Sequence, residues 1–376
     1  MIKVKNKEIG AGKPIFLTAE IGCGHDGDFE RCKHLMRVAK ESGCDGTDVF
    51  MMDTETYVHH DCGLKPAFDS YLAEIKRLSF TEAQWKEYFR YGNELGLVAY
   101  CTPLGVGAIH TAIKCGAPML NINSDEVTDL GFLRAIAKTG VPLTMHDINA
   151  TLGEVEAAVT VLLDNGCKEL IVLHSTLEAN DPVLSYEGAN LRMIETYRRA
   201  FSDRGVLTGC VEHTTSKWLI YAVAALQPAL ISKHLLVTHD EKVADSTISL
   251  QASEMKEIIS NVRKTEQALG QGSNFVKCEK DGKLPEGNIW RRKVLVTSRD
   301  IKAGEKLSRD DFMAKRPGNM GGLHPWYAEI LHGARAKKDM PKNTIIDLNM
   351  AEDIPLPEYR PYALKKRCYD GQYVGP

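Results

Sequence analysis

The stretch "PLTMHDINATLGEVEAAVTVLLDNGCKELIVLHS" (142–175) contains one complete strand–helix–strand unit. Short apolar runs typical of strands begin and end it, and between them apolar side chains recur at helical spacing from Val155 to Leu162. Thr151 and Glu154 have the spacing of a capping box at the start of this helix. The glycine of "DNG" is a common helix stop. The stretch therefore predicts a helix between two strands.

The same unit recurs along most of the chain. Eight such units in roughly 250 residues are what a (β/α)8 TIM barrel requires. The rival fold, a doubly wound open sheet, is disfavoured because no GxGxxG follows the first apolar run. We therefore expect an α/β fold with a barrel over residues 1–270, whose strands are predicted at 14–21, 46–51, 97–103, 118–123, 142–148, 169–175, 206–213 and 229–237.

The composition changes after the predicted barrel. Residues 271–289 are polar and glycine-rich, which is typical of a linker. Residues 290–354 return to short β-type runs separated by turn signals and predict a small β-rich domain. Residues 355–376 form a tail with no obvious core of its own. We expect the small domain to cap the mouth of a barrel, either the barrel of its own chain or that of a second subunit.

Bulk composition excludes several classes of function. The 376 residues are 43% hydrophobic, and the net charge of −3 gives no electrostatic case for binding nucleic acid or an anionic membrane. No apolar run approaches the ~18 residues of a membrane span. Ten cysteines are scattered without a CxxC pair, so neither a disulfide framework nor a zinc ribbon is indicated. We expect a cytoplasmic protein that acts on a small molecule.

Polar residues gather at the predicted C-terminal ends of the strands, where the reactive groups of a barrel meet. Five of the twelve histidines lie there. His213 and His234 end neighbouring strands and can reach one divalent ion, which could polarise a carbonyl; the alternative is two hydrogen-bonded histidines at loop starts. The full set is Glu20, His25, Asp48, Thr102, Asn121, Ser124, Glu126, His146, Asp147, His174, Thr176, Glu212, His213 and His234.

Several motifs resemble the sialic acid synthase (N-acetylneuraminate synthase) family, including its C-terminal antifreeze-like (SAF) domain. Those enzymes condense phosphoenolpyruvate with an N-acylated amino sugar to give a nonulosonic acid. The resemblance runs in order from about residue 14 to 350 and is carried by "AEIGCGHDGD" (19–28), "CTPLG" (101–105), "NINSDEVTDLGFLRAIAKTG" (121–140), "EHT" (212–214), "SKH" (232–234) and "KRPGN" (315–319).

The resemblance implies roles for individual residues. His213 and His234 match the family histidines that hold a divalent metal, typically Mn²⁺, with Mg²⁺, Co²⁺ or Zn²⁺ as alternatives. Glu20 matches a glutamate proposed to handle protons or orient substrate, and Glu126 matches the glutamate after the fourth strand. Arg316 matches an arginine that reaches from one subunit into its partner's barrel to contact the sugar. A domain-swapped homodimer is therefore implied.

The chain departs from the family at the phosphoenolpyruvate site. Asp48 and Asn121 stand where family members usually have lysines, "HDIN" (146–149) replaces a serine-bearing motif, and Val211 replaces another serine. Two ammonium groups thus become an acid and an amide, in a site for a trianion. Lys233 is a candidate source of the missing charge. The hydroxyl donors that remain for substrate binding are Thr102, Ser124 and Thr176.

Three hypotheses follow. The first is a metal-dependent enzyme that joins a three-carbon donor to a sugar-type aldehyde, giving a nonulosonic or related sugar acid. The second is changed chemistry on the same scaffold, aldol-type or carbon–carbon cleavage of a non-phosphorylated substrate, with Asp48, His146 and Asp147 as a new acid/base or second metal set. The third is a catalytically silent homologue that binds sugar or assists assembly.

Overall fold

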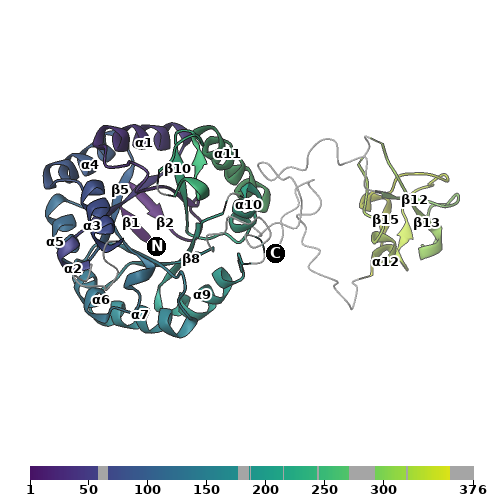
Figure 1. Cartoon of the computed structure of the whole chain (residues 1–376). Coiled ribbons are helices and arrows are strands. Elements are labelled where there is room, and N and C mark those ends of the chain that lie inside the picture. The colour runs from purple at the N-terminus through teal and green to yellow at the C-terminus, as the bar shows by residue number, and fades with distance from the viewer. Residues whose placement is uncertain are drawn as a thin grey trace. The chain divides into compact units, whose positions relative to one another are not determined.

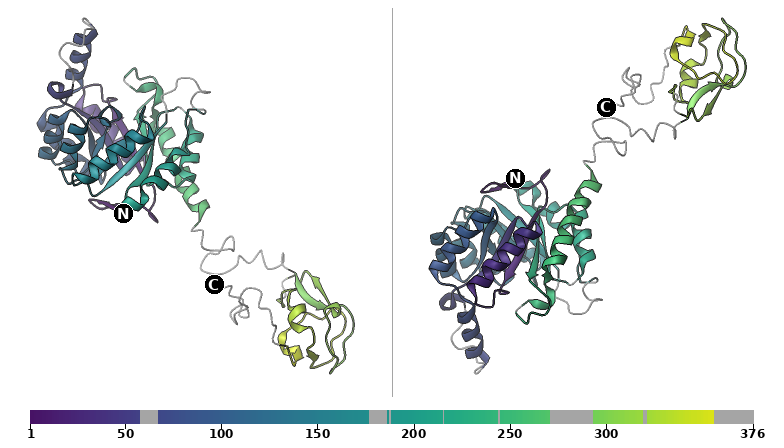
Figure 2. Two further views of the ribbon diagram at one scale, coloured as in Figure 1. Left: turned by 90° about the horizontal axis from the view of Figure 1, so that it is seen from below. Right: turned by 90° about the horizontal axis from the view of Figure 1, so that it is seen from above.

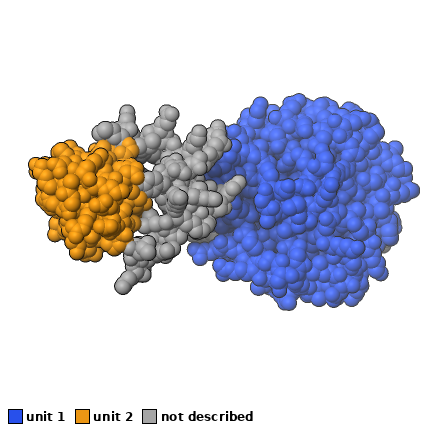
Figure 3. All heavy atoms as spheres, turned by 180° about the vertical axis from the view of Figure 1, so that it is seen from behind, with its two compact units in different colours: residues 1–270 blue, residues 271–376 orange. Residues whose placement is uncertain are grey.

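The computed structural model describes residues 1–57, 67–176, 186, 188–214, 216–243, 245–270, 293–318 and 321–355, with the backbone alone at 67–71. The chain forms two compact units, Met1–Gly270 and Gln271–Pro376 (Figure 3). Residues 271–289 of the predicted linker and 356–376 of the predicted tail lie outside the described residues.

Eight parallel strands form a closed barrel in the first unit, as predicted (Figure 1). Consecutive strands are neighbours throughout, and β10 pairs with both β9 and β3, which closes the ring. A two-residue strand, β11 (Leu250–Gln251), adds to β10. The barrel strands are β3 (Phe16–Gly22), β4 (Gly46–Met52), β5 (Val98–Leu104), β6 (Leu120–Ile122), β7 (Leu143–His146), β8 (Leu170–Ser175), β9 (Leu207–Glu212) and β10 (Leu230–Leu236).

Helices surround the barrel in Figure 1. Thr81 and Thr151 make the expected capping boxes at the starts of two of them. Gly43 ends another in the left-handed conformation (φ 96°), which a glycine adopts without strain. The helices of this unit are α1 (Phe29–Ser42), α2 (Thr54–Tyr57), α3 (Ala67–Leu78), α4 (Glu82–Leu95), α5 (Val106–Cys115), α6 (Leu130–Ala137), α7 (Leu152–Asp164), α9 (Met193–Phe201), α10 (Lys217–Ala225) and α11 (Ala252–Leu269), with 3-10 turns η1 (Ser124–Glu126), η2 (Ser202–Arg204) and η3 (Ser246–Ile248).

An N-terminal hairpin of β1 (Ile2–Val4) and β2 (Lys7–Ile9) closes one end of the barrel (Figure 2). Its apolar side chains pack against residues at the strand starts, Phe16 and Val98 among them. The apolar plug occupies the end where the strands begin. Polar side chains are therefore left to gather at the opposite end, where the strands finish.

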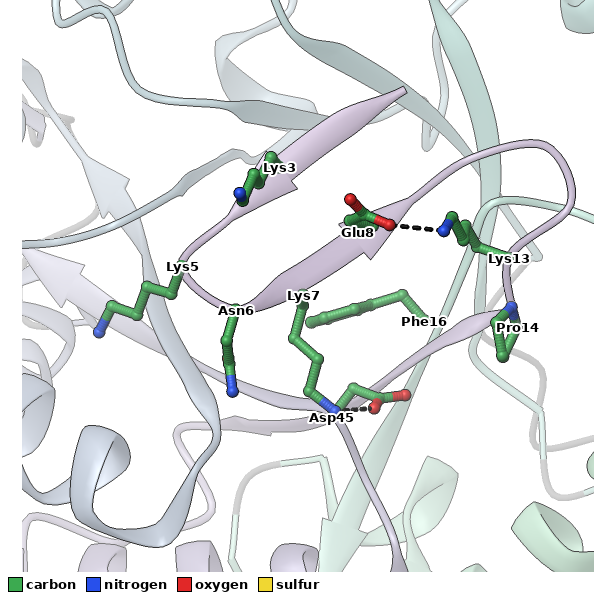
Figure 4. A pocket seen from close by; sticks show the side chains of 9 residues that line it. All are labelled: Lys3, Lys5, Asn6, Lys7, Glu8, Lys13, Pro14, Phe16 and Asp45. Atoms are coloured by element: carbon green, nitrogen blue, oxygen red, sulfur yellow. Dashed lines mark hydrogen bonds and ion pairs between the residues drawn. The ribbon is translucent and has the colours of Figure 1, made fainter.

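A pocket beside this hairpin is lined by lysines (Figure 4). Lys7 pairs with Asp45 at 2.6 Å, and Lys13 pairs with Glu8 at 2.5 Å. The pocket lies at the end of the barrel that carries stability rather than chemistry in this fold. We therefore place the candidate site elsewhere.

The second unit has its own small core, to which Leu295, Phe312 and Leu331 contribute. Two strand pairs and short helical turns build it, so it is β-rich as predicted. Its elements are β12 (Val294–Thr297), η5 (Arg309–Asp311), β13 (Phe312–Lys315), α12 (Tyr327–Leu331), β14 (Arg335–Ala336), η6 (Leu348–Met350) and β15 (Ala351–Glu352). In neither unit does a described helix have the length and apolarity needed to cross a bilayer.

Candidate functional site

Strand alternation decides which polar residues at the strand ends face the barrel interior. Ile171, Leu173 and Val211 belong to the interior cluster, so the side chains two residues further along these strands point the same way. By the same rule His174 and Lys233 point outward. Facing inward at the C-terminal end are Glu20, Asp48, Thr102, Asn121, His146, Ser175, His213 and His234; this set of described residues contains no lysine or arginine.

Glu20, His213 and His234 converge on one point. One ligand atom from each lies within 4.8 Å of the other two, and all three residues are buried. The two imidazole rings have their centroids 5.5 Å apart. Two imidazole nitrogens and one carboxylate oxygen are a donor set that suits a first-row divalent ion. The described residues thus contain a ligand set of the correct chemistry for a metal, and we call it the metal trio.

Thr176 fixes the orientation of His213. Its hydroxyl accepts a hydrogen bond from the His213 backbone N–H at 2.8 Å, and its carbonyl lies 3.1 Å from His213 Nδ1. Because a carbonyl only accepts, Nδ1 carries the proton and Nε2 keeps its lone pair. Such a second contact is typical of metal-binding histidines. Burial, then the charge of His234, lower the pKa of His213 to about 3, so its neutral form dominates at neutral pH.

Glu20 and His234 lie on neighbouring strands with their Cα atoms in register. His234 Nε2 is 3.5 Å from Glu20 Oε1, and Ser232 donates its hydroxyl hydrogen to Glu20 Oε2 at 3.0 Å. Burial alone would raise the pKa of Glu20, but His234, His146 and His213 outweigh it and lower the pKa to about 2. Glu20 is therefore a carboxylate at neutral pH.

The last residue of β3, Gly22, leaves room for the metal trio. Gly22 has a φ of +53°, and a Cβ at this position would lie 3.2 Å from Asp245 Oδ2 and 3.3 Å from His234 Cε1. Asp245 Oδ2 is 3.9 Å from the Nδ1 atom of His234. A residue larger than glycine would therefore be strained here and would crowd both side chains.

Four residues on the other strands form a continuous hydrogen-bond network. Thr102 donates to Asp48 Oδ2 at 2.7 Å, and Asn121 Nδ2 lies 2.8 Å from Thr102 Oγ1 and 3.1 Å from His146 Nε2. Thr144 donates to Asn121 Oδ1 at 2.7 Å. We call Asp48, Thr102, Asn121 and His146 the polar network. Burial, then the charge of Glu20, raise the pKa of Asp48 well above its ordinary value.

Asp147 is held away from the metal trio. Its Oδ2 atom is 3.1 Å from His174 Nδ1 and accepts a hydrogen bond from the Tyr197 hydroxyl at 2.6 Å, while Oδ1 accepts one from the Ser175 backbone N–H. His174 Nε2 lies 2.8 Å from the carbonyl of Ala189, so both ring nitrogens of His174 face acceptors. Burial lowers the pKa of His174, but the bond to Asp147 outweighs it and raises the pKa. This cluster ties β7 and β8 to α9.

Lys233 does not supply charge to the barrel interior. Its ammonium group is 2.8 Å from Glu212 Oε2 and donates to the backbone carbonyls of Glu212 and Thr214. It therefore serves an outward-facing ion pair between β9 and β10. Lys233 therefore does not replace the two lysines that the family resemblance would place at Asp48 and Asn121.

Three predicted residues belong to neither the metal trio nor the polar network. Glu126 accepts a hydrogen bond from the Gly105 backbone N–H at 3.1 Å, and burial raises its pKa. Ser124 is half-buried at the start of η1. Arg316 belongs to the second unit, next to the end of β13.

Sequence reasoning missed four residues of the site. Ser232 and Thr144 lie two positions before His234 and His146, so period-two alternation could have placed both inside the barrel. Alternation also places Ser175 inside the barrel. Its hydroxyl is buried without a partner among the described residues. Asp245 follows β10 in a loop, where no periodicity points to it.

The fold and these side chains define a TIM-barrel protein with a candidate metal-ligand set at its strand ends, followed by a small β-rich unit. The chain belongs to the NeuB family, whose model matches residues 35–274, and an SAF domain model matches residues 292–352. The family resemblance read from the motifs is thereby confirmed.

Relatives match over nearly the whole chain. The uncharacterized protein MJ1065 of Methanocaldococcus jannaschii is 30% identical over 345 residues, which cover 92% of this chain and 97% of the relative. The N,N'-diacetyllegionaminic acid synthase of Campylobacter jejuni is 27% identical over 344 residues, with 89% and 99% covered. The crystal structure of the spore coat polysaccharide biosynthesis protein SpsE from Bacillus subtilis aligns with a TM-score of 0.61 at 26% identity and covers 95% of this chain and 99% of that one. The protein is thus similar to sugar acid synthases.

Proposed function

We propose that the protein is a metal-dependent synthase that joins a three-carbon donor to the aldehyde of a sugar, giving a nonulosonic or related sugar acid. The observation that carries this proposal is the metal trio of Glu20, His213 and His234 at the C-terminal end of a NeuB-family barrel. A relative that is a legionaminic acid synthase supports the same class of product.

The trio would hold one divalent ion. Mn²⁺ is the first candidate, and Mg²⁺, Co²⁺ and Zn²⁺ are the alternatives. When bound, such an ion supplies a Lewis acid that polarises an aldehyde oxygen. The protein's own part is to keep the ligands ready: Thr176 directs the His213 lone pair, and Ser232 holds the Glu20 carboxylate. Glu20 is also a buried carboxylate 3.5 Å from His234, so it is our candidate for moving a proton at the reacting carbon.

A product assay tests the proposal. The manganese-loaded protein is incubated with N-acetylated amino sugars, N-acetylmannosamine first, and with either phosphoenolpyruvate or pyruvate. Addition of pyruvate to the aldehyde gives the same nine-carbon acid as phosphoenolpyruvate with water and loss of phosphate, so one mass identifies both reactions. We expect this acid with one donor and none from His213→Ala. Failure of both donors across the sugar panel, with metal bound, would contradict the proposal.

A second candidate is favoured by the polar network. With Asp48 and Asn121 in place of cations, aldol-type addition or cleavage of a non-phosphorylated substrate becomes the competing reaction. Product from pyruvate, with no product or phosphate release from phosphoenolpyruvate, identifies it, whereas phosphate release from phosphoenolpyruvate identifies the parent condensation. A silent homologue yields product from neither donor.

We also infer a domain-swapped homodimer in which Arg316 of one subunit contacts the sugar in its partner's barrel. The SAF match and the "KRPGN" motif at 315–319 support this inference. Sedimentation velocity should give a dimer, and Arg316→Ala should chiefly raise the KM for sugar, because its contact is far from the new bond. A fully active monomer would rule it out.

A further inference from the structure

In the polar network, the donor and the acceptor of each hydrogen bond can be identified. Thr144 donates to Asn121 Oδ1, so the amide nitrogen of Asn121 faces Thr102 and His146. That nitrogen donates to Thr102 Oγ1 and to His146 Nε2, which must therefore carry a lone pair. Thr102 in turn directs its only hydrogen to Asp48 Oδ2. These assignments leave one Asp48 oxygen outside the network.

That oxygen, Asp48 Oδ1, is buried and has no hydrogen-bond partner among the described residues. Asp48 is 2% exposed and lies on the inward side of β4. Ser175, on the inward side of β8, is 7% exposed, and its Oγ atom is also buried without a partner there. Buried polar atoms nearly always have a partner in folded proteins. Two such atoms on interior faces at the same end of the barrel indicate where a ligand's polar groups bind.

Charge decides what kind of group can bind beside Asp48. Its Cα neighbour on β3 is Glu20, a second buried acid that also points inward. The ammonium group of Lys233 is engaged by Glu212 on the outward side. No lysine or arginine faces these two residues among the described strand ends, so a phosphate group finds no cationic side chain beside Asp48. A hydroxyl or ammonium group can instead donate a hydrogen bond to the free oxygen.

We propose that the polar network forms a subsite for a hydroxyl or ammonium group of the substrate, with Asp48 Oδ1 as the acceptor, and that Asp48 selects against phosphate. This inference deepens the proposed function and rests on it, because it names the class of the second substrate as non-phosphorylated. Asp48 is a specificity-determining residue here. Asn121 and Thr102 are positioning residues that hold its carboxyl group.

Binding of four three-carbon acids tests the proposal without turnover. Phosphoenolpyruvate, pyruvate, lactate and alanine carry a phosphate, an oxo, a hydroxyl and an ammonium group on the second carbon. Calorimetric titration of each acid into the full-length protein ranks their affinities, once with Mn²⁺ bound and once after a chelator has removed the metal. We expect lactate or alanine to bind about tenfold more tightly than phosphoenolpyruvate, and Asp48→Asn to shrink that ratio to near one. Asp129→Asn is the matched control, because Asp129 is an exposed helix cap where asparagine serves equally well, and its ranking should equal that of the wild type.

Circular dichroism verifies that the variants fold, and Asp48→Ser serves as a second variant if Asp48→Asn does not. Phosphoenolpyruvate binding as tightly as lactate and alanine, or no binding of these two at millimolar concentration, overturns the proposal. A ranking unchanged by the Asp48 substitution overturns the role of Asp48. None of these outcomes depends on forming a carbon–carbon bond, so a failed product assay and a failed ranking are separate results.

Discussion

At the ends of β3, β9 and β10 three buried ligand groups face one another, whereas on β4 to β7 four buried side chains are hydrogen-bonded to one another. In the metal trio, Glu20 and two imidazoles converge on one point. In the polar network, each hydrogen from Asn121 and Thr102 already has an acceptor. The two halves occupy the same end of one barrel but differ in what they offer to a ligand. The trio offers converging lone pairs to a cation, and the network offers one free acceptor oxygen to a hydrogen-bond donor.

This difference separates a set of groups that together bind one ion from a network in which only one atom is left free to bind. Converging lone pairs favour an ion, because the ion replaces repulsion with coordination. The internal hydrogen bonds of the network, in a low-dielectric interior, stabilise one arrangement and resist a change of charge. The halves should therefore respond differently to mutation.

Removing a histidine from the metal trio should have the largest effect. His213→Ala or His234→Ala deletes a ligand, and we expect metal binding to be lost and activity to fall by about a thousandfold or more. The fold should persist, because the strands keep their pairing. Metal content by mass spectrometry and the melting temperature with and without Mn²⁺ are the measurements. A variant that retains one tightly bound ion would show that the trio is not the metal site.

Charging the polar network should be nearly as damaging. Asp48→Lys combined with Asn121→Lys breaks four hydrogen bonds and places two ammonium groups in a buried network, and we expect the native activity to be lost and the free energy of unfolding to fall by about 3–5 kcal/mol. If the protein used phosphoenolpyruvate, the same change would leave its affinity unchanged or improve it. Urea unfolding and phosphoenolpyruvate titration distinguish the two results.

His25 shows what a histidine at a strand end does outside both halves. Its Nδ1 accepts a hydrogen bond from the Gly27 backbone N–H, its ring lies 4.4 Å from Phe80, and burial lowers its pKa to about 4. Because the folded pKa is below the unfolded value, the unfolded chain binds the extra proton between the two, and stability falls as pH falls from about 6.5 toward 4. From pH 7 to 5 the wild type should lose about 2 kcal/mol more than His25→Asn. Equal losses in urea titrations would contradict this structural role.

A pair of matched threonines gives the smallest effect. Thr176→Val removes the hydroxyl that holds the His213 backbone, and we expect metal affinity to fall by about tenfold. Thr144→Val removes a hydroxyl of equal burial from the polar network and should leave metal affinity unchanged. Equal losses in calorimetric titrations of Mn²⁺ would mean that the halves are not separate.

Much of the barrel could be predicted from the sequence. Its eight apolar runs alternate with helices that begin at capping boxes, such as that of Thr151 and Glu154. Such patterns can be read from the sequence because they involve residues that are close along the chain. The convergence of His213 and His234 was also predictable, because their strands are adjacent in any such barrel.

The side-chain partners were not predictable to the same degree. Lys233 shows the limit: its type suggested a phosphate ligand, but alternation turns it outward to Glu212. Asp147 similarly finds Tyr197, fifty residues later on a helix. Such long-range pairs depend on how helices pack on the barrel, which no local pattern records.

A crystal soaked with Mn²⁺ and phosphoenolpyruvate tests the contrast between the two halves most directly. Anomalous scattering locates manganese without reference to activity. The account predicts one peak about 2.0–2.3 Å from the ligand atoms of Glu20, His213 and His234, and no phosphate density beside Asp48 and Asn121. A manganese peak elsewhere, or a phosphate bound against Asp48, would contradict it.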